Sequence, residues 1–155
     1  MLIRVRPAKV QDQDFVIEAA RRLAAFELPP WRAAHELVGG EVRTLDDFFE
    51  RGAAGAVLLI AVDEAEEPLG FAFVETVIDY FSGAPHAHLG ILAVTEAAEG
   101  RGAARALLKA AEDWSVGEHF DKLTLNVFER NRHARAVYEH CGYEVETLRY
   151  VKLLR

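Results

Sequence analysis

A short glycine-containing stretch in the second half of the chain has the composition of an anion-binding turn. It follows an apolar run that ends near Val94, and it carries Gly100 and Gly102. Glycine has no Cβ, so the backbone N–H groups beside it can approach a ligand closely. The helix expected after Gly102 adds unpaired N–H groups and a positive dipole end. These features predict a site for a pyrophosphate-sized anion. A Walker loop and a dinucleotide fingerprint do not fit, because the Lys-Ser/Thr pair and the third glycine are missing. On these residues alone, an ordinary strand-to-helix turn is an equal interpretation.

A second stretch places an asparagine and a tyrosine two helical turns apart. The run from Asn131 to Tyr143 reads NRHARAVYEHCGY. Asn131 and Tyr138 therefore face the same side of a helix. A tyrosine within hydrogen-bond reach of a leaving group can act as a general acid. Taken alone, Tyr138 would be an ordinary aromatic residue on the apolar stripe of that helix.

Titratable side chains alternate along the two apolar runs before the turn. His86 and His88 lie on one face of the second run, and strict alternation would put Gly90 and Leu92 on that same face. An imidazole titrates near neutral pH, so His88 is a candidate base, with His86 next to it. The alternative is that neither histidine has a role. Glu75 and Asp79 share a face of the first run and could bind a cation or relay a proton.

The apolar periodicity predicts the elements that position these side chains. Alternating or continuous apolar runs predict strands over residues 2–6, 56–62, 70–80, 86–94, 122–128, 143–145 and 148–153. Apolar spacings of three and four predict helices over 15–26, over 31–51 as one or two pieces, over 103–116 and over 131–141. About seven strands and about four helices make an α+β (α/β) fold with a mostly antiparallel sheet. We expect residues 1–155 to form one domain.

Composition and charge exclude several classes of protein. A single cysteine, Cys141, excludes a disulfide scaffold, and 51% hydrophobic residues exclude a disordered tail. No apolar run approaches the roughly 20 residues of a membrane helix, and no secretory leader is evident, so we expect a cytoplasmic protein with no membrane partner. The net charge of −7 argues against nucleic acid. This charge divides into −9 over residues 1–99 and +2 over residues 100–155, which would suit two unlike ligands.

The two stretches together resemble the GNAT family, the GCN5-related N-acetyltransferases. The acetyl-CoA motif of that family reads Arg/Gln-x-x-Gly-x-Gly/Ala after a strand that ends in a hydrophobic-x-Val pattern. In this chain Glu99-Gly100-Arg101-Gly102-Ala103-Ala104 follows Leu92-Ala93-Val94. Glutamate replaces the usual Arg or Gln, and we expect Glu99 to point to solvent. The second stretch matches the family's Asn-x-x-Ala-x-x-x-Tyr-x-x-x-Gly-Phe/Tyr motif at every keyed position.

The resemblance implies a GNAT fold, in which a splayed sheet holds the pantetheine arm of acetyl-CoA like an additional strand. It implies that Tyr138 protonates the leaving thiolate. It assigns cofactor binding to Leu92, Ala93, Val94, Gly100, Arg101, Gly102, Ala103, Ala104, Arg105 and Asn131. Where many relatives carry a glutamate base this chain has Gly90, which makes His88 the candidate base.

The acceptor side is expected in the first helices and their loop. Glu27, Trp31, Glu75 and Asp79 are the candidate substrate-binding residues, and Glu36 and Glu41 follow Trp31 in the same region. An acidic pocket with an aromatic wall suits a cationic amine. The end of the first helix resembles the diamine and polyamine acetyltransferase branch.

The resemblance implies an acetyl-CoA-dependent N-acetyltransferase, and we expect it to use no metal. Its acceptor would be a primary amine of a small cationic molecule, reached by direct transfer. Two alternatives stay open, which are a protein or peptide amino group as the acceptor and a non-catalytic acyl-CoA-binding sensor. Dimerisation is common in the family, so a homodimer is an expectation that this sequence does not decide.

Overall fold

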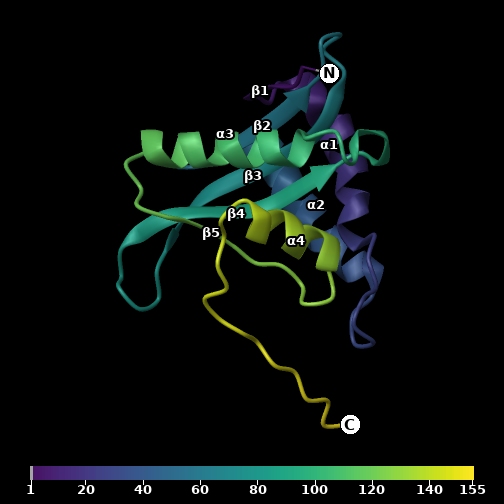
Figure 1. The fold of residues 1–155 in the computed structure, drawn as a ribbon, viewed down its shortest axis with the longest axis vertical. Helices are drawn as coiled ribbons and strands as arrows, with labels where there is room; N and C mark the ends of the chain where they lie inside the picture. Colours follow the sequence, from purple (N-terminus) through teal and green to yellow (C-terminus); the bar gives the residue numbers. More distant parts are fainter. Residues whose placement is uncertain (1) are drawn as a thin grey trace.

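A five-stranded sheet forms the centre of the computed structural model, which describes residues 2–155 (Figure 1). The strands are β1 (Arg4–Pro7), β2 (Val57–Val62), β3 (Pro68–Ile78), β4 (Pro85–Val94) and β5 (Leu123–Leu125). They lie side by side in that order. β1 to β4 are antiparallel to one another, and β5 joins β4 in parallel. The predicted α+β fold with a mostly antiparallel sheet is confirmed.

Helices cover both faces of this sheet. They are α1 (Gln13–Ala20), α2 (Ala34–Arg51), α3 (Ala103–Gly117) and α4 (Arg132–His140), with short 3-10 turns at Val10–Asp12, Arg21–Ala24 and Glu96–Ala98. α1 and α2 pack with one apolar cluster, around Phe71 and Leu45, and α3 packs with another, around Leu107. The helix predicted over 15–26 is shorter than expected, because it tightens into a 3-10 turn after Ala20. Within residues 2–155, no helix combines the length and apolar character that a membrane crossing requires.

A β-bulge interrupts the pairing of β3 with β4. Val74 pairs with Leu89 and Phe73 pairs with Ile91, which leaves Gly90 between them without a partner. Such a bulge inserts one residue and shifts the side-chain alternation by one position. Odd-numbered residues before Gly90 and even-numbered residues after it therefore face the same side of the sheet.

The bulge corrects one expectation about β4. Leu92 packs with the α3-side cluster, as Leu89 does. His88 alternates with Leu89 and so points to the opposite face, toward α1 and α2. The expectation that His88 and Leu92 share a face is wrong, because strict alternation ends at Gly90.

The sheet opens between β4 and β5. The two strands pair only over Ala87–Leu89 and Leu123–Leu125. After Leu125 the chain turns toward α4, so residues 90–94 of β4 have no strand partner on this side within the described part of the chain (Figure 1). This splay is the gap that the resemblance implies.

The two strands predicted at the C-terminus are not formed. Residues 144–155 are exposed and extend away from the rest of the chain (Figure 1). β5 is also shorter than the predicted 122–128. Alternating residues form a strand only when an edge is available to pair with. The sheet therefore has five strands where about seven were expected.

Candidate active site

The turn before α3 has an anion-binding geometry. Gly100 and Gly102 have φ values of 72° and 93°, in the left-handed region, and no atom lies within 4 Å of the position where either Cβ would be. The first bond of the helix runs from the Ala106 N–H to the Gly102 carbonyl, at 3.0 Å. The N–H groups of residues 103–105 precede that bond and have no acceptor within the helix. They form a row of donors at the positive end of α3.

Glu99 is exposed, as expected, and its carboxylate also forms a salt bridge with Arg22. Its Oε1 accepts a hydrogen bond from Nη2 of Arg22 at 2.7 Å. The same guanidinium donates through Nε to the Val94 carbonyl at 3.1 Å. Arg22 therefore compensates the negative charge beside the anion-binding turn. It also uses the Val94 carbonyl, one of the backbone groups that the sequence assigned to the cofactor.

Tyr138 lies on the side of the sheet where the gap opens. It is partly buried against the α3-side cluster, together with Leu92 and Val94 from the unpaired part of β4. Its ring packs edge-on against Tyr143, with ring centroids 6.1 Å apart. Burial raises the pKa of Tyr138 to about 12. The phenol therefore keeps its proton at neutral pH and can serve as a donor.

Asn131 caps the helix that carries Tyr138. Its Oδ1 accepts a hydrogen bond from the Ala134 N–H at 3.3 Å. This is a structural role that any capping asparagine would fill. The cap uses the side-chain oxygen of Asn131 and leaves its amide nitrogen available as a donor.

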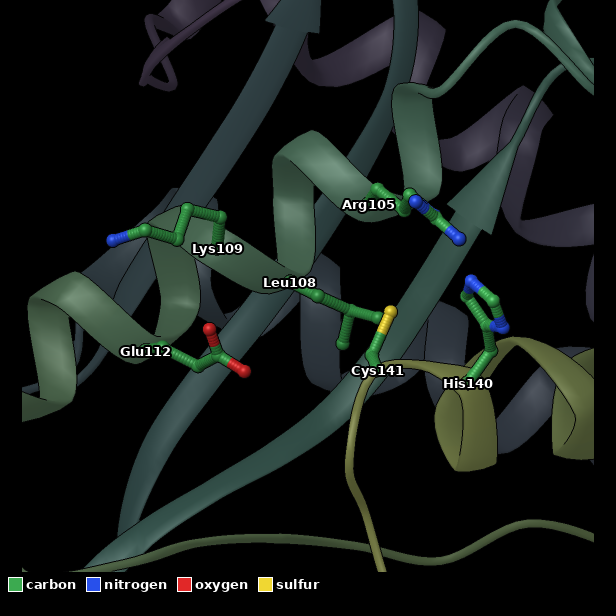
Figure 2. A pocket seen from close by; sticks show the side chains of 6 residues that line it. All are labelled: Arg105, Leu108, Lys109, Glu112, His140 and Cys141. Carbon is green, nitrogen blue, oxygen red and sulfur yellow. The ribbon is translucent and has the colours of Figure 1, made fainter.

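A groove of about 280 Å³ separates α3 from α4 (Figure 2). It is lined by Arg105, Leu108, Lys109, Glu112, His140 and Cys141. Figure 2 shows Arg105 and His140 pointing toward each other across the groove, with the Cys141 sulfur near Leu108. Because Arg105 lies in the first turn of α3, this groove begins at the anion-binding turn.

Two carboxylates lie close enough to influence each other on the opposite face, beside the bulge. A Cβ at Gly90 would lie 3.0 Å from Oε2 of Glu75, so the Glu75 carboxylate covers Gly90 from the neighbouring strand. Glu41 on α2 is partly buried nearby. Burial and the charge of Glu75 raise the pKa of Glu41. A cation placed between the two carboxylates would relieve this repulsion.

Both predicted histidines contact one threonine of β5. Nδ1 of His88 lies 2.8 Å from Oγ1 of Thr124, and Nε2 of His86 lies 3.0 Å from the same atom. The hydroxyl has only one hydrogen, so at least one of these ring nitrogens must carry a proton. Burial and the neighbouring His86 lower the pKa of His88. His88 is therefore neutral at pH 7 and able to accept a proton.

Glu75 and His88 are neighbours across the strands. They are directly paired in the β3–β4 register. Because both strands alternate regularly on that side of the bulge, the carboxylate and the imidazole share the face that α1 and α2 cover. The structure thus brings one predicted substrate-binding residue and the predicted base together, and we call Glu41, Glu75 and His88 the acceptor cluster.

The comparisons with known proteins decide the family. The model of the acetyltransferase (GNAT) family matches residues 19–143. The chain belongs to the GNAT acetyltransferase family. No curated protein is similar enough in sequence to match the chain.

Solved GNAT-type structures resemble this chain over its whole length. An acetyl transferase assigned in Pyrococcus furiosus has a TM-score of 0.77 and 21% identity, covering 99% of this chain and 100% of its own. The ribosomal-protein-alanine N-acetyltransferase of Brucella melitensis has a TM-score of 0.70 and 18% identity, covering 99% and 100%. AAC(6')-Iy, solved with the bisubstrate analogue CoA-S-monomethyl-acetylneamine, has a TM-score of 0.73 and 18% identity, covering 100% and 99%. At these identities the likeness establishes the fold.

The remaining acceptor-side residues of this GNAT chain lie apart from the acceptor cluster. Trp31, in the loop after α1, lies under the Arg130 guanidinium, 5.8 Å from its ring centre. Its aromatic face is thus occupied by a side chain of the protein. Glu27 is exposed on the same loop. Phe26 of this loop packs against Phe128 with centroids 5.5 Å apart, which joins it to the segment before α4.

Asp79 belongs to a loop rather than to the acceptor cluster. Its carboxylate pairs with Lys122 at 2.6 Å and accepts hydrogen bonds from the N–H groups of Phe81 and Ser82. The Lys122 hydrogen bond and these loop amides lower the pKa of Asp79 to about 2. Because β3 ends at Ile78, Asp79 no longer follows the alternation that would place it beside Glu75.

Two residues of the site were not predicted from the sequence. Thr124 joins the histidines, and Arg22 neutralises Glu99. Each depends on a contact between distant segments, so no local pattern points to it. The signal for Glu41 was stronger, because it lies four residues before the fully buried Leu45 on the same face of α2.

Proposed function

We propose that this GNAT protein is an acetyl-CoA-dependent N-acetyltransferase that acts on a primary amine of a small cationic molecule. The observation that carries the proposal is the acceptor cluster. The Glu75 carboxylate covers Gly90, His88 pairs with Glu75 in the strand register, and Glu41 lies within electrostatic reach of Glu75. Carboxylates attract an ammonium group, and a neutral imidazole can deprotonate it.

The cofactor side of the proposal rests on the other half of the site. The row of amides at residues 103–105 binds the pyrophosphate of acetyl-CoA, and Arg105 at the α3–α4 groove adds a positive charge. Leu92 and Ala93 offer the unpaired edge of β4 to the pantetheine arm. The Arg22–Glu99 salt bridge supports this assignment, because it compensates the acidic residue beside the phosphates.

In the proposed reaction the chain's residues move two protons. Glu41 and Glu75 hold the ammonium form of the acceptor, and His88 takes one proton from it. The amine nitrogen then forms its bond to the acetyl carbon while the carbon–sulfur bond breaks. Tyr138, which is protonated at neutral pH, gives its proton to the departing sulfur. The acetylated nitrogen loses its second proton as the neutral amide forms, and this proton restores the Tyr138 phenol.

Glu75 is the second candidate for the base. Its carboxylate covers Gly90. Many GNAT relatives resemble one another in having a glutamate at this position. A carboxylate supplied from β3 can thus stand in for one on β4. Separate variants of Glu75 and His88 show through their pH profiles which of the two residues is the base.

The test is a measurement of coenzyme A release from acetyl-CoA with a panel of acceptors. The panel holds diamines and polyamines, an aminoglycoside, a peptide with a free N-terminus, and an uncharged alcohol as the control. We expect turnover with the small polycationic amines and none with the alcohol. Turnover on the peptide alone would favour a protein acceptor. Binding of acetyl-CoA, measured by calorimetry, without turnover on any acceptor would favour the sensor and contradict the proposal.

A further inference from the structure

Thr124 of β5 links the two histidines of β4 through its hydroxyl group. Its Oγ1 lies 2.8 Å from Nδ1 of His88 and 3.0 Å from Nε2 of His86. The same hydroxyl can donate to the Ala87 carbonyl, which lies 3.4 Å away. These three contacts depend on one another, because a hydroxyl has one hydrogen to donate and two lone pairs that accept. The positions of the hydrogens on the two rings are therefore linked through one oxygen atom.

The burial of His86 decides where its own hydrogen lies. The residue is 8% exposed, and its Nδ1 is buried without a hydrogen-bond partner among residues 2–155. A hydrogen on Nδ1 would be a buried donor without an acceptor, which folded proteins avoid. The neutral ring therefore carries its hydrogen on Nε2 and donates it to Oγ1 of Thr124. This bond takes one lone pair of the oxygen, so His86 does not accept the hydroxyl hydrogen.

One arrangement of the hydrogens uses all three contacts of Thr124. The hydroxyl donates to the Ala87 carbonyl, and Oγ1 accepts from Nε2 of His86 and from Nδ1 of His88. If the hydroxyl donated to His88 instead, the contact with the Ala87 carbonyl would be lost. The arrangement with three hydrogen bonds places the hydrogen of His88 on Nδ1. The lone pair of this ring then lies on Nε2.

The second ring nitrogen of His88 is open to a ligand. His88 lies between Glu75 and Thr124, its register partners on β3 and β5. Its Nδ1 is used by the bond to Thr124, whereas Nε2 makes no hydrogen bond within residues 2–155. The side chain is only partly buried. Nε2 is thus the nitrogen that remains to take a proton from a bound ammonium group.

We propose that Thr124 is a positioning residue, which holds His88 in the tautomer that accepts a proton at Nε2. The identity of His88 as the base rests on the proposed function, whereas its tautomer is a property of the free protein. In the transfer, an N–H bond of the ammonium group breaks as the Nε2–H bond forms, and the amine nitrogen keeps the electron pair. The bond from Nδ1 to Thr124 stays in place, because both nitrogens of an imidazolium are donors. Groups that need not reorganise during a transfer favour it.

The first experiment determines the tautomer of His88 in the free protein by long-range 1H–15N correlation NMR. The spectra are recorded at about pH 8, where the lowered pKa of His88 leaves the ring neutral. His88→Gln and His86→Gln assign the two rings among the six histidines of the chain. We expect the hydrogen on Nδ1 of His88 and on Nε2 of His86. A hydrogen on Nε2 of His88 in the wild-type protein would overturn the proposal, whatever its activity.

Variants of Thr124 test whether its hydroxyl holds the tautomer. Thr124→Val removes the hydroxyl at nearly constant volume, and we expect the hydrogen of His88 to move toward Nε2. Thr124→Ser keeps the hydroxyl and should keep the wild-type tautomer. The matched control is Thr76→Val on β3, whose hydroxyl donates to the Gly55 carbonyl at 2.7 Å instead of to a histidine. An unchanged tautomer in Thr124→Val, with a native circular dichroism spectrum, would overturn the positioning role.

The second experiment measures kcat and KM with an acceptor that supports coenzyme A release. Thr124→Val should lower kcat by about tenfold, which is less than the ~10²–10⁴-fold that a general base contributes as a whole. The KM for the acceptor should change little, because Glu41 and Glu75 remain. Thr124→Ser should restore most of the kcat, and Thr76→Val should match the wild type. An equal kcat in Thr124→Val and wild type would contradict the positioning role.

The two experiments separate this proposal from the proposed function. Absence of turnover on every acceptor would overturn the proposed function. The tautomer of His88 would still be decided by the spectra of the free protein, which contains no substrate.

Discussion

The chemistry of the acceptor side depends on which side chain covers Gly90. The missing Cβ makes room for the Glu75 carboxylate, which would otherwise be displaced. The same bulge keeps His88 on the face of α1 and α2. One glycine thus lets a carboxylate from β3 and an imidazole from β4 occupy one site. From the family resemblance, Gly90 indicated only that the usual glutamate is missing, and it did not indicate that Glu75 covers this position.

At the residue scale, the Tyr138→Phe variant tests the proposed acid. Removing the hydroxyl should lower kcat by about 100-fold and leave the KM for acetyl-CoA nearly unchanged, because the ring still packs against the α3-side cluster. Tyr143→Phe is the matched control, since it removes the neighbouring hydroxyl that bonds Glu112 instead. Steady-state kinetics measure both variants. An unchanged kcat in Tyr138→Phe would remove this residue from the acid role.

The pH profile of His88→Gln tests the proposed base. Burial and His86 lower the pKa of His88 from its usual value of 6.5, so the neutral form persists below that pH. Wild-type kcat/KM should fall as the pH drops through this lowered pKa, because the base becomes protonated. His88→Gln should lose most activity near neutral pH and should lack this acidic limb. The gap to wild type should narrow at high pH, where the amine is already neutral.

The Glu75→Gln variant provides the comparison for that profile. If His88 is the base, Glu75→Gln should raise the KM for the cationic acceptor and keep the acidic limb. A lost limb in Glu75→Gln together with a retained limb in His88→Gln would assign the base to Glu75. His133→Gln, at an exposed position on α4, controls for the loss of a histidine.

At the scale of elements, the close approach of β3 to β4 keeps the site in place. A Cβ at Gly70 would lie 2.6 Å from the Ala93 carbonyl oxygen and 3.1 Å from the Val94 Cα. Both contacts are with backbone, which cannot rotate away. The two strands can therefore lie at this distance only because position 70 is glycine.

We expect Gly70→Ala to lower the free energy of unfolding by about 1–3 kcal/mol, as overpacking in a core does. Urea unfolding followed by circular dichroism measures the change. Gly117→Ala at the end of α3 is the control, because no atom lies within 4 Å of its Cβ position. The control should be neutral or slightly stabilising. Equal stability of Gly70→Ala and wild type would mean that the strands shift easily.

The turn before α3 gives a second prediction at this scale. Arg22→Gln leaves Glu99 without its salt bridge beside the proposed phosphate site, and the KM for acetyl-CoA should rise by about three- to tenfold. Because the repulsion comes from Glu99, the double variant Arg22→Gln/Glu99→Gln should recover much of the loss. Kinetics at low salt give the clearest result. No recovery in the double variant would show that Arg22 acts through its Val94 hydrogen bond instead.

The elements that could be predicted are those defined by local patterns. The apolar stripe of α3 and the apolar runs of β2 and β3 are defined by neighbouring residues, as is the glycine turn before α3. The bulge at Gly90 could not be predicted, because it depends on how β4 pairs with β3. The same holds for the Arg22–Glu99 salt bridge, which joins segments far apart in the chain. The prediction of two C-terminal strands was wrong for a related reason. The residues of a segment do not indicate whether a sheet edge is available for it to pair with.

At the scale of the whole molecule, the uneven charge favours two different ligands. Residues 1–99 carry −9 and contribute Glu41 and Glu75, while residues 100–155 carry +2 and contribute Arg105. This division fits the proposed pairing of a cationic acceptor with an anionic cosubstrate. The organisation of residues 1–155 as one domain stays a prediction.

The charge division predicts that salt lowers kcat/KM more strongly for a diamine acceptor than for a monoamine acceptor. The kcat/KM for a diamine should fall as ionic strength rises from about 0.01 to 0.15 M, over which the screening length shrinks from about 30 to 8 Å. The effect should be weaker for a monoamine of similar length, because it carries fewer charges. Kinetics at fixed saturating acetyl-CoA measure this. An equal salt response for the two amines would argue against an acidic acceptor side.

The contact between the loop after α1 and the segment before α4 has a thermodynamic consequence. Phe26 packs on Phe128, and Trp31 packs under Arg130, so the two segments are in direct contact. One segment borders the acceptor side, and the other leads into the helix that carries Asn131 and Tyr138. A ligand that shifts either segment therefore changes the affinity for the other ligand, and by linkage the two effects are equal. The proposed acceptor side and the proposed cofactor side would thus be coupled in binding through this aromatic contact.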